Sequence, residues 1–258
     1  MTTDTQNDKT KRAAKLFQQS KHAVAFSGAG ISTESGIPDY RSAESGLWTS
    51  KIDPMAVASI SSFKRDPQIF YDWVRPLAKT TLEAKPNPAH MALAELEHMS
   101  CLLGIITQNI DGLHARAGSK RVYELHGHMR AATCMQCSAA YNGDVLITQF
   151  IEDGVVPHCA KCQGVIKPNV VLYGEELPTR VLHDAQVATN ECDLMLIVGS
   201  SLEVAPASMM PIQARRNGAK LVIVNLEPTH VDRMAEVVIH ARAAEILPAI
   251  VNELKEML

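Results

Sequence analysis

The chain alternates short apolar runs with longer segments in which apolar residues recur every three or four positions. The runs are typical of buried strands, and we expect strands over residues 23–26, 102–107, 122–125, 170–173, 194–198, 221–224 and 237–239. The periodic segments predict helices over residues 11–22, 89–99, 179–189, 206–217 and 243–257. Strands and helices that alternate in this way form a mainly parallel sheet covered on both faces. The predicted fold class is therefore α/β.

Two stretches depart from this alternation. Residues 53–79 have a helical pattern interrupted at Asp66 and Pro67, where Pro67 suits the first position of a new helix and Asp66 suits its cap. From Met129 to about Lys167 the chain becomes polar and rich in cysteine. We interpret this second stretch as a small module inserted into a discontinuous α/β domain.

Four of the six cysteines form two C-x2-C pairs, Cys134 with Cys137 and Cys159 with Cys162, separated by 21 residues. Two such pairs in one short segment match the ligands and the spacing of a tetrahedral zinc site. Four thiolates leave no open position for water or substrate, so the predicted Zn²⁺ is structural. Redox pairs or unrelated buried cysteines are the alternative interpretation.

Composition and charge are those of an ordinary soluble domain. The sequence is 46% hydrophobic and 21% charged, and its 25 basic and 28 acidic residues give a formal net charge of -3. These values argue against disorder and give no bulk reason to expect nucleic-acid or membrane-surface binding. No apolar run approaches the roughly 20 residues that cross a bilayer, and residues 1–12 lack the pattern of a secretory or transit peptide. A cytoplasmic location is expected, with Cys101 and Cys192 unbridged.

A glycine-rich turn follows the first predicted strand. Gly28 and Gly30 lie at the carboxyl end of that strand, where backbone N–H groups can approach a pyrophosphate. Thr33 stands where a G-x-G-x-x-G motif has its third glycine, so a purely geometric turn is the alternative. The polar segment 34–41 could fold over a ligand, and its Arg41 suits a phosphate or a carboxylate.

Polar side chains also follow other predicted strands. Asn109 and Asp111 come after the second strand, where side chains of an α/β sheet either bind ligands or cap the next helix. His126 ends the third strand and is a candidate general base, with a structural histidine as the alternative. The same placement of small polar residues recurs at Gly199, Ser200, Ser201 and Asn225.

These features occur together in an order that resembles the sirtuin family of NAD-dependent protein-lysine deacylases. The resemblance rests on the segments 28–41 (GAGISTESGIPDYR), 107–111 (TQNID), 125–127 (LHG), 168–175 (PNVVLYGE), 199–201 (GSS) and 224–225 (VN), together with the four paired cysteines. The motifs span nearly the whole chain. They imply a large Rossmann-like domain, a small domain that combines a zinc ribbon with a helical segment, and NAD in the cleft between them.

Placed on this sequence, the implied Rossmann-like domain comprises residues 1–43, 80–128 and 168–258. The small domain comprises a helical module at 44–79 and a zinc-ribbon module at 129–167. By the same resemblance, an acylated lysine enters an apolar tunnel from the side opposite NAD, and its peptide pairs with the strand around residues 171–173.

The family motifs imply a role for each matching residue. His126 is implied to be the catalytic base, with Asn109 as a second catalytic residue. The residues implied to bind NAD are Gly28, Ala29, Gly30, Thr33, Asp39, Tyr40, Arg41, Gln108, Asn109, Ile110, Asp111, Gly199, Ser200, Ser201 and Asn225. The residues implied to bind the peptide are Val171, Leu172, Tyr173, Gly174 and Glu175.

The implied reaction removes an acetyl or other uncharged acyl group from a protein lysine and yields nicotinamide and O-acyl-ADP-ribose. Nicotinamide leaves the ribose, the acyl oxygen attacks the carbon left behind, and His126 takes a proton from a ribose hydroxyl. Family members that act on succinyl or malonyl lysine carry a Tyr-x-x-Arg pair, which Tyr71, Val74 and Arg75 do not reproduce. Uncharged acyl groups, acetyl first, are therefore favoured.

Two other functions remain open. An NAD-consuming ADP-ribosyltransferase or glycohydrolase on the same fold would share the cofactor residues without an acyl tunnel, although His126 and the strand at 170–171 favour deacylation. A non-catalytic zinc-ribbon adaptor, such as one that binds nucleic acid, would need a basic and aromatic ribbon. The ribbon here carries Asp144, Glu152 and Asp153 and little basic excess, so direct nucleic-acid binding is not expected.

Overall fold

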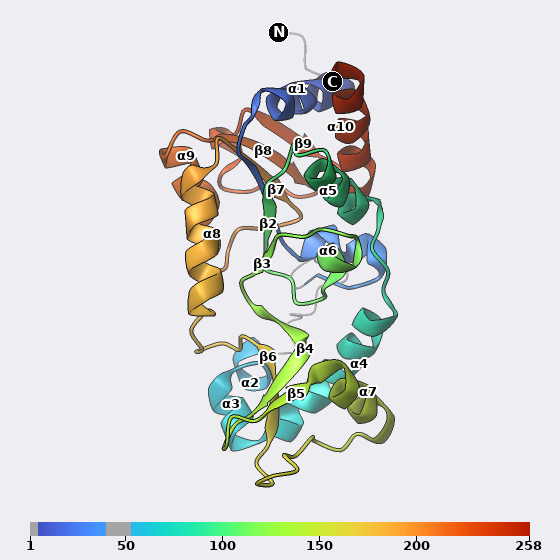
Figure 1. Cartoon of the computed structure of the whole chain (residues 1–258), viewed down its shortest axis with the longest axis vertical. Helices are drawn as coiled ribbons and strands as arrows, with labels where there is room; N and C mark the ends of the chain where they lie inside the picture. Colours follow the sequence, from blue (N-terminus) through green and yellow to red (C-terminus); the bar gives the residue numbers. More distant parts are fainter. Residues whose placement is uncertain (1–4, 40–52) are drawn as a thin grey trace.

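The computed structural model describes residues 5–39 and 53–258. Its largest element is a six-stranded parallel sheet in the order β3-β2-β1-β7-β8-β9 (Figure 1). The strands are β1 (Ala23–Ser27), β2 (Gly104–Thr107), β3 (Val122–Glu124), β7 (Leu194–Val198), β8 (Lys220–Asn225) and β9 (Val237–His240). The chain order reverses between β1 and β7, and the crevice at such a switch point is where open α/β sheets bind ligands.

Helices cover both faces of this sheet, as the sequence pattern predicts. One face packs against α1 (Gln6–Gln19), α5 (Pro88–His98) and α10 (Ala243–Met257), and the other against α8 (Thr179–Glu191) and α9 (Met209–Arg216) (Figure 1). Successive side chains of each strand point to opposite faces of the sheet. Ala25 and Leu196 therefore belong to one core, and Phe26 and Ile197 belong to the other. Burial on both faces explains why these strands are continuous apolar runs. The predicted doubly wound α/β class is confirmed.

Most predicted elements are present, and several have shifted ends. The bounds of β7 and α10 are those predicted. The strand expected over residues 170–173 is instead β6 (Ile166–Val170), because it pairs antiparallel with β4 (Gly127–Cys134) and this ladder ends at Val170. The helix expected from residue 206 begins at Met209, since residues 205–208 form a turn.

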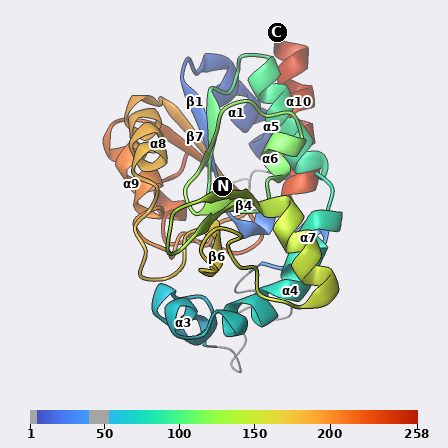
Figure 2. The same cartoon turned by 60° about the horizontal axis from the view of Figure 1, so that its bottom comes forward.

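A small module lies at the end of the molecule opposite α10 (Figure 1), and Figure 2 turns this end towards the viewer. Its antiparallel sheet has the order β5-β4-β6, with β5 at Ala140–Asn142. The helices beside the sheet are α2 (Pro54–Val57), α3 (Ile60–Arg65), α4 (Pro67–Glu83) and α7 (Gly143–Asp153). As predicted, α4 starts at Pro67 and Asp66 is its cap, accepting from the Gln68 N–H at 3.0 Å. The sequence did not predict α7, whose buried Ile147 and Phe150 lie within the polar, cysteine-rich stretch.

An aromatic cluster holds the helices of the small module to its sheet. Phe63, Phe70, Tyr71 and Phe150 pack together with ring centroids 4.8 to 6.1 Å apart. The hydroxyl of the buried Tyr71 donates to the carbonyl of Ile166 in β6 at 2.7 Å. Because burying one such ring stabilises a fold by about 1.5–3 kcal/mol, this cluster gives the helical part of the module a core of its own.

The four paired cysteines meet at the end of β4. Their sulfur atoms all lie within 4.8 Å of one another, with Cys134 Sγ 3.5 Å from Cys162 Sγ and Cys137 Sγ 3.6 Å from Cys159 Sγ. A tetrahedron with zinc–sulfur bonds of ~2.3 Å has edges of about 3.8 Å, so this spacing fits one Zn²⁺ ion. The apolar cluster around the sulfurs is small, and metal ligation would supply the folding energy that burial does not.

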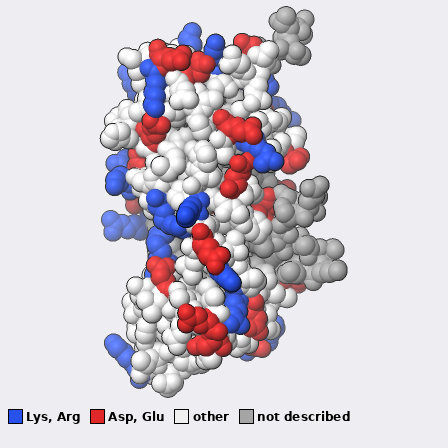
Figure 3. All heavy atoms as spheres, turned by 90° about the vertical axis from the view of Figure 1, so that its right-hand side faces the viewer, with Lys and Arg blue, Asp and Glu red and all other residues white. Residues whose placement is uncertain are grey.

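Charged side chains of both signs share the molecular surface. On the face in Figure 3, basic and acidic side chains occur near one another along the length of the molecule. Among the described residues on that face, the Lys and Arg side chains form no continuous stripe. Among the described residues, no helix combines the length and the apolar character needed to span a membrane.

Removing the metal is expected to unfold the β5-β4-β6 sheet while the parallel sheet and α7 stay folded, because the parallel sheet has two large cores of its own and α7 packs in the aromatic cluster. The measurement is amide hydrogen exchange before and after chelation, read separately for β4 and β7. As a matched pair, Cys134→Ser should reproduce the loss of protection in β4, whereas Cys101→Ser, outside the cluster, should not. Full protection of β4 after stoichiometric loss of zinc would contradict a structural ion.

Candidate active site

A wide cleft lies between the carboxyl ends of the parallel strands and the small module. Its volume is about 1660 Å³, which exceeds what a single drug-sized ligand requires. The residues that follow β1, β2, β3 and β7 line one side, and β6 and α4 line the other. A cleft of this size and mixed lining can hold a polar ligand against the strand ends and an apolar group against the small module.

The structure brings most of the sequence-predicted site residues to this cleft. Those that line it are Gly28, Ala29, Gly30, Thr33, Asp39, Gln108, Ile110, His126, Val171, Leu172, Tyr173, Gly174, Glu175, Gly199, Ser200, Ser201 and Asn225. Asn109 and Asp111 line a small adjoining cavity of about 30 Å³. Tyr40 and Arg41 lie outside the described residues. The four paired cysteines do not line the cleft.

Glycines at the ends of β1 and β7 let these strands approach each other closely. A Cβ on Gly28 would lie 2.7 Å from the carbonyl oxygen of Gly199, and a Cβ on Gly199 would lie 2.2 Å from the backbone nitrogen of Ile31. Gly199 also has a φ of 61°, a conformation that glycine adopts without strain. The N–H groups of Gly28 and Gly30 donate to the carbonyls of Val198 and Gly199 at 3.1 and 2.8 Å. These two amides therefore donate within the protein and join the ends of β1 and β7.

His126 lines the cleft just after β3, and a backbone carbonyl fixes its ring. Nδ1 lies 2.9 Å from the carbonyl oxygen of Gln108. A carbonyl can only accept, so the hydrogen is assigned to Nδ1 and Nε2 keeps its lone pair. Burial lowers the pKa of His126 below its ordinary value of 6.5, and the bond to Gln108 partly opposes this shift. The ring is therefore neutral at pH 7 and can accept a proton, as a general base must.

Asn109 and Asp111 are held by the loop that follows β1. The Asn109 amide donates to the Gly28 carbonyl at 3.1 Å and to the Ser32 hydroxyl at 3.2 Å. Asp111 accepts from the Ser32 hydroxyl at 2.7 Å and from the Leu113 N–H at 2.8 Å. Burial raises the pKa of Asp111, while these two hydrogen bonds lower it. Leu113 is the first residue of the short helix α6 (Leu113–Arg116), whose N-cap is Gly112. Asp111 therefore satisfies one N–H at the start of this helix and also lines the small cavity.

Two histidines behind this loop were not predicted as part of the site. His90 and His114 are almost wholly buried, with ring centroids 5.0 Å apart. His114 Nε2 lies 2.8 Å from the Ser27 hydroxyl, and His90 Nε2 lies 3.4 Å from the Ser32 hydroxyl. Burial lowers the pKa of His90 to about 4 and, together with the nearby His90, lowers that of His114 to about 3. Their partners lie more than 50 residues away in the chain, so no local pattern could identify them.

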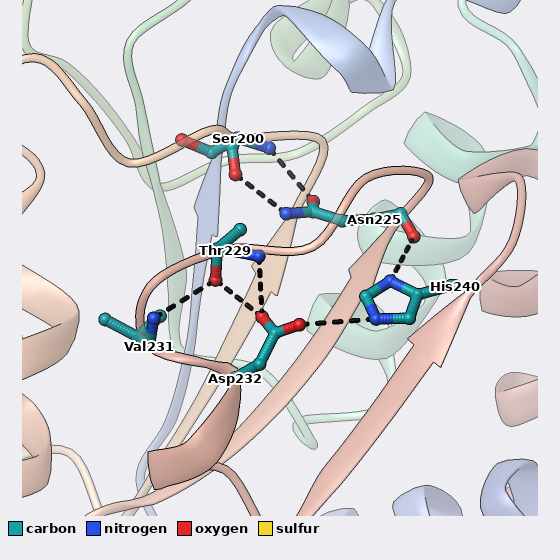
Figure 4. Close-up of polar contacts among 6 residues, drawn as sticks. All are labelled: Ser200, Asn225, Thr229, Val231, Asp232 and His240. Carbon is teal, nitrogen blue, oxygen red and sulfur yellow. Dashed lines mark hydrogen bonds and ion pairs between the residues drawn. The ribbon is translucent and has the colours of Figure 1, made fainter.

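Ser200 and Asn225 join the ends of β7 and β8 (Figure 4). The Asn225 side chain accepts from the Ser200 N–H at 3.0 Å and donates to the Ser200 carbonyl at 2.7 Å. Figure 4 also shows His240 between the Asp232 carboxylate, at 3.2 Å, and the Asn225 carbonyl, at 3.4 Å. Asp232 accepts in turn from Thr229. This chain of contacts orders the loop after β8, and sequence reasoning missed it because β9 supplies His240 only in the folded sheet.

The segment after β6 runs beside His126 and contacts the helices of the small module. The Val171 N–H donates to the His126 carbonyl at 2.9 Å. Tyr173 donates its N–H to the Ala58 carbonyl at 2.9 Å and accepts from the Ile60 N–H at 3.0 Å. The segment predicted to bind a peptide is therefore held by backbone bonds at both ends, with one end next to the candidate base.

Comparison with known proteins adds sequence relatives along nearly the full chain. Residues 28–206 match the Sir2 family. The chain is 49% identical over 254 residues to an NAD-dependent protein deacylase 2 of Archaeoglobus fulgidus, covering 97% of this chain and 98% of that protein. It is 46% identical over 240 residues to an NAD-dependent protein deacetylase of Sulfurisphaera tokodaii, covering 93% and 94% of the two chains.

Solved structures agree with these relatives. A structure described as the basis for the mechanism and regulation of Sir2 enzymes has a TM-score of 0.91 at 47% identity, over 98% of this chain and 100% of that chain. A complex of Sir2 with a p53 peptide and NAD+ has a TM-score of 0.86 at 38% identity, over 95% and 98% of the two chains. With sequence and structure matching along the whole length, the chain belongs to the Sir2 family.

Proposed function

We propose that this protein removes acetyl or other uncharged acyl groups from protein lysines in an NAD-dependent reaction that yields nicotinamide and O-acyl-ADP-ribose. The observation that carries the proposal is the His126 ring, which the Gln108 carbonyl fixes at 2.9 Å with a neutral Nε2 at the cleft. Two findings on relatives support NAD and an acyl-lysine peptide as the ligands. The A. fulgidus and S. tokodaii proteins are named as NAD-dependent protein deacylase and deacetylase, and a Sir2 structure contains a p53 peptide and NAD+.

NAD supplies a ribose carbon that becomes electrophilic as nicotinamide leaves. Asn109 and Asp111, held through Ser32, are assigned to orient nicotinamide and its ribose. Ser200 and Asn225 are assigned to the adenosine half, where their mutual hydrogen bonds fix the strand ends. His126 accepts a proton from a ribose hydroxyl at Nε2. The other cofactor residues named from the motifs, Tyr40 and Arg41 included, keep their assignment on the motifs alone.

The acyl-lysine is assigned to the small-module side of the cleft. Apolar side chains line this side, including Phe70, Trp73 and Val74 of α4 and Ile110. Such a lining suits a lysine stem and an apolar acyl group, because both lose water on entry. Residues 171–175 keep their assignment to the peptide on the motifs alone, because the N–H groups of Val171, Leu172 and Tyr173 already donate within the protein.

Engaged polar groups in α4 support a preference for uncharged acyl chains. The Arg75 guanidinium donates to the carbonyls of Ile151, at 3.1 and 2.6 Å, and Glu152, at 3.3 Å. The Tyr71 hydroxyl donates to a carbonyl of β6. Both side chains already have protein partners, so neither is free to pair with the carboxylate of a succinyl or malonyl group.

The proposal includes the division of the chain into two domains. The Rossmann-like domain is assigned residues 1–43, 80–128 and 168–258, and the small domain is assigned residues 44–79 and 129–167. Separate cores on the two sides of the cleft support this division. The boundary at residue 168 falls inside β6, which spans Ile166–Val170.

A cytoplasmic location is also part of the proposal. All six cysteines are free of disulfide bonds, which suits a reducing compartment. Four of them must stay reduced and deprotonated to hold zinc. Cysteine chemistry therefore favours the cytoplasm over an oxidising compartment.

Wild-type protein is expected to release nicotinamide from NAD only when an acetyl-lysine peptide is present. His126→Ala should lower peptide-dependent release by about 100-fold or more, the usual contribution of a general base. His183→Ala, which removes an exposed histidine, is the matched control and should keep wild-type activity. Equal release without peptide would favour the glycohydrolase, and full activity of His126→Ala would remove this histidine from its role.

The fall in activity at low pH should report the protonation of His126. Its folded pKa lies below 6.5 because of burial, and only the neutral form above that pKa can accept a proton. Activity is therefore expected to hold through pH 7 and to fall only below pH 6.5. The measurement is kcat/KM for the acetyl-lysine peptide between pH 5 and 8. A loss of activity centred above pH 6.5 would contradict the assignment.

A panel of acyl-lysine peptides of one sequence should separate the acyl groups by charge. Acetyl-lysine is expected to exceed succinyl-lysine in kcat/KM by about tenfold or more, since a buried carboxylate would lack a partner. Arg75→Ala should leave this ratio unchanged, because the guanidinium is engaged with carbonyls. A selective fall in succinyl turnover in that variant would show that Arg75 does bind the carboxylate.

A further inference from the structure

Lys167 is a buried cation that no step of the proposed reaction uses. It lies in β6 and is only 7% exposed. Its ammonium donates to the carbonyls of Pro168, at 3.2 Å, and Val170, at 2.7 Å, and forms an ion pair with the Glu175 carboxylate at 2.9 Å. An ammonium has three N–H donors, so these three acceptors can satisfy it completely.

Glu175 closes the other side of this arrangement. The carboxylate oxygen that faces Lys167 also accepts the Leu172 N–H at 2.8 Å, and the Glu175 N–H donates to the Leu172 carbonyl at 3.0 Å. Gly174 has a φ of 86°, which allows the backbone to turn between these residues. One ammonium therefore joins the beginning of the segment 168–175 to its end.

The segment 168–175 lies between the candidate base and the apolar side of the cleft. Val171 donates to the His126 carbonyl at 2.9 Å. Val170 and Leu172 pack in the aromatic core of the small module and also line the cleft. A change in the path of this segment would alter the surface offered to a peptide, while the ends of β7 and β8 would stay in place.

Stability alone is a weak reason to keep such a pair. Removing two charges from water offsets much of their attraction, and apolar residues of similar volume are often as stable or more so. A buried ammonium with every donor satisfied, paired with a partly exposed carboxylate, can instead hold one backbone geometry. We propose that Lys167 is a positioning residue for the peptide substrate, whose ammonium sets the path of residues 168–175 without touching the reacting atoms. This inference rests on the deacylase activity proposed above.

The test compares Lys167→Met, Glu175→Gln and the double variant by steady-state kinetics with an acetyl-lysine peptide and NAD. Lys167→Met is expected to raise the KM for peptide about tenfold or more, the effect of losing one charged hydrogen bond, and to change the KM for NAD less than about twofold. Lys255→Met is the matched control, because Lys255 forms a similar ion pair with Glu95 on the surface. It should leave both KM values unchanged.

The double-mutant cycle distinguishes positioning from a separate peptide contact. If Lys167 acts through Glu175, the double variant should raise the peptide KM no more than the stronger single variant. Glu175 is partly exposed, so Glu175→Gln keeps the test available should Lys167→Met fail to fold. Unchanged peptide KM in Glu175→Gln, fully additive effects, or equal rises in both KM values in Lys167→Met would each overturn the inference.

Failure of the inference and failure of the proposed function give different results. A wild-type protein that releases nicotinamide equally without peptide would refute the deacylase. A wild-type protein that needs the peptide, with a Lys167→Met variant of unchanged peptide KM, would refute only the positioning role.

Discussion

The candidate site depends on the close approach of β1 and β7 at the point where the sheet order reverses. Gly28 and Gly199 leave no room for a Cβ between the two strand ends, so this approach requires glycine at both positions. The adjacent strands β2 and β8 end at the same edge of the sheet. Polar residues that lie more than 80 positions apart in the chain therefore meet in one cleft, and a different strand order would separate them.

Behind that edge of the sheet lie two buried histidines, His90 and His114, that carry no charge at pH 7. His90 and His114 face serine hydroxyls, and a protonated ring at either position would be a cation in the core without a charged partner. Burial accordingly keeps both rings neutral at pH 7. As neutral groups, these two rings can fix the direction of the Ser27 and Ser32 hydroxyls, the second of which supports Asn109 and Asp111, without repelling a cationic nicotinamide. The same neutrality at His126 leaves its Nε2 able to accept a proton.

Sequence reasoning succeeded where a feature is encoded locally. The apolar run at β7 and the two cysteine pairs appear in the structure at the predicted places, and most of the polar residues named after β1, β2, β3, β7 and β8 line the cleft. It failed where the contact partner is remote or the composition misleads. The contacts of His90 and His114 join residues that are far apart in the chain, and the ion pair of Lys167 with Glu175 depends on irregular backbone. The bonds from the Gly28 and Gly30 amides to the carbonyls of Val198 and Gly199 are of the same kind, because their partners lie about 170 residues away in the chain. The helix α7 was missed because it lies in a polar, cysteine-rich segment.

The course of β4 explains how a metal cluster outside the cleft can still affect its chemistry. This strand begins at Gly127, directly after His126, and ends at Cys134, one of the four clustered cysteines. Its partner β6 leads into Val171, whose N–H donates to the His126 carbonyl. Gly127, the residue after His126, is thus the first residue of β4, and Val171 comes directly after β6. A bound ion would therefore be linked to the base through the backbone of β4 and β6, with no need for an open coordination position.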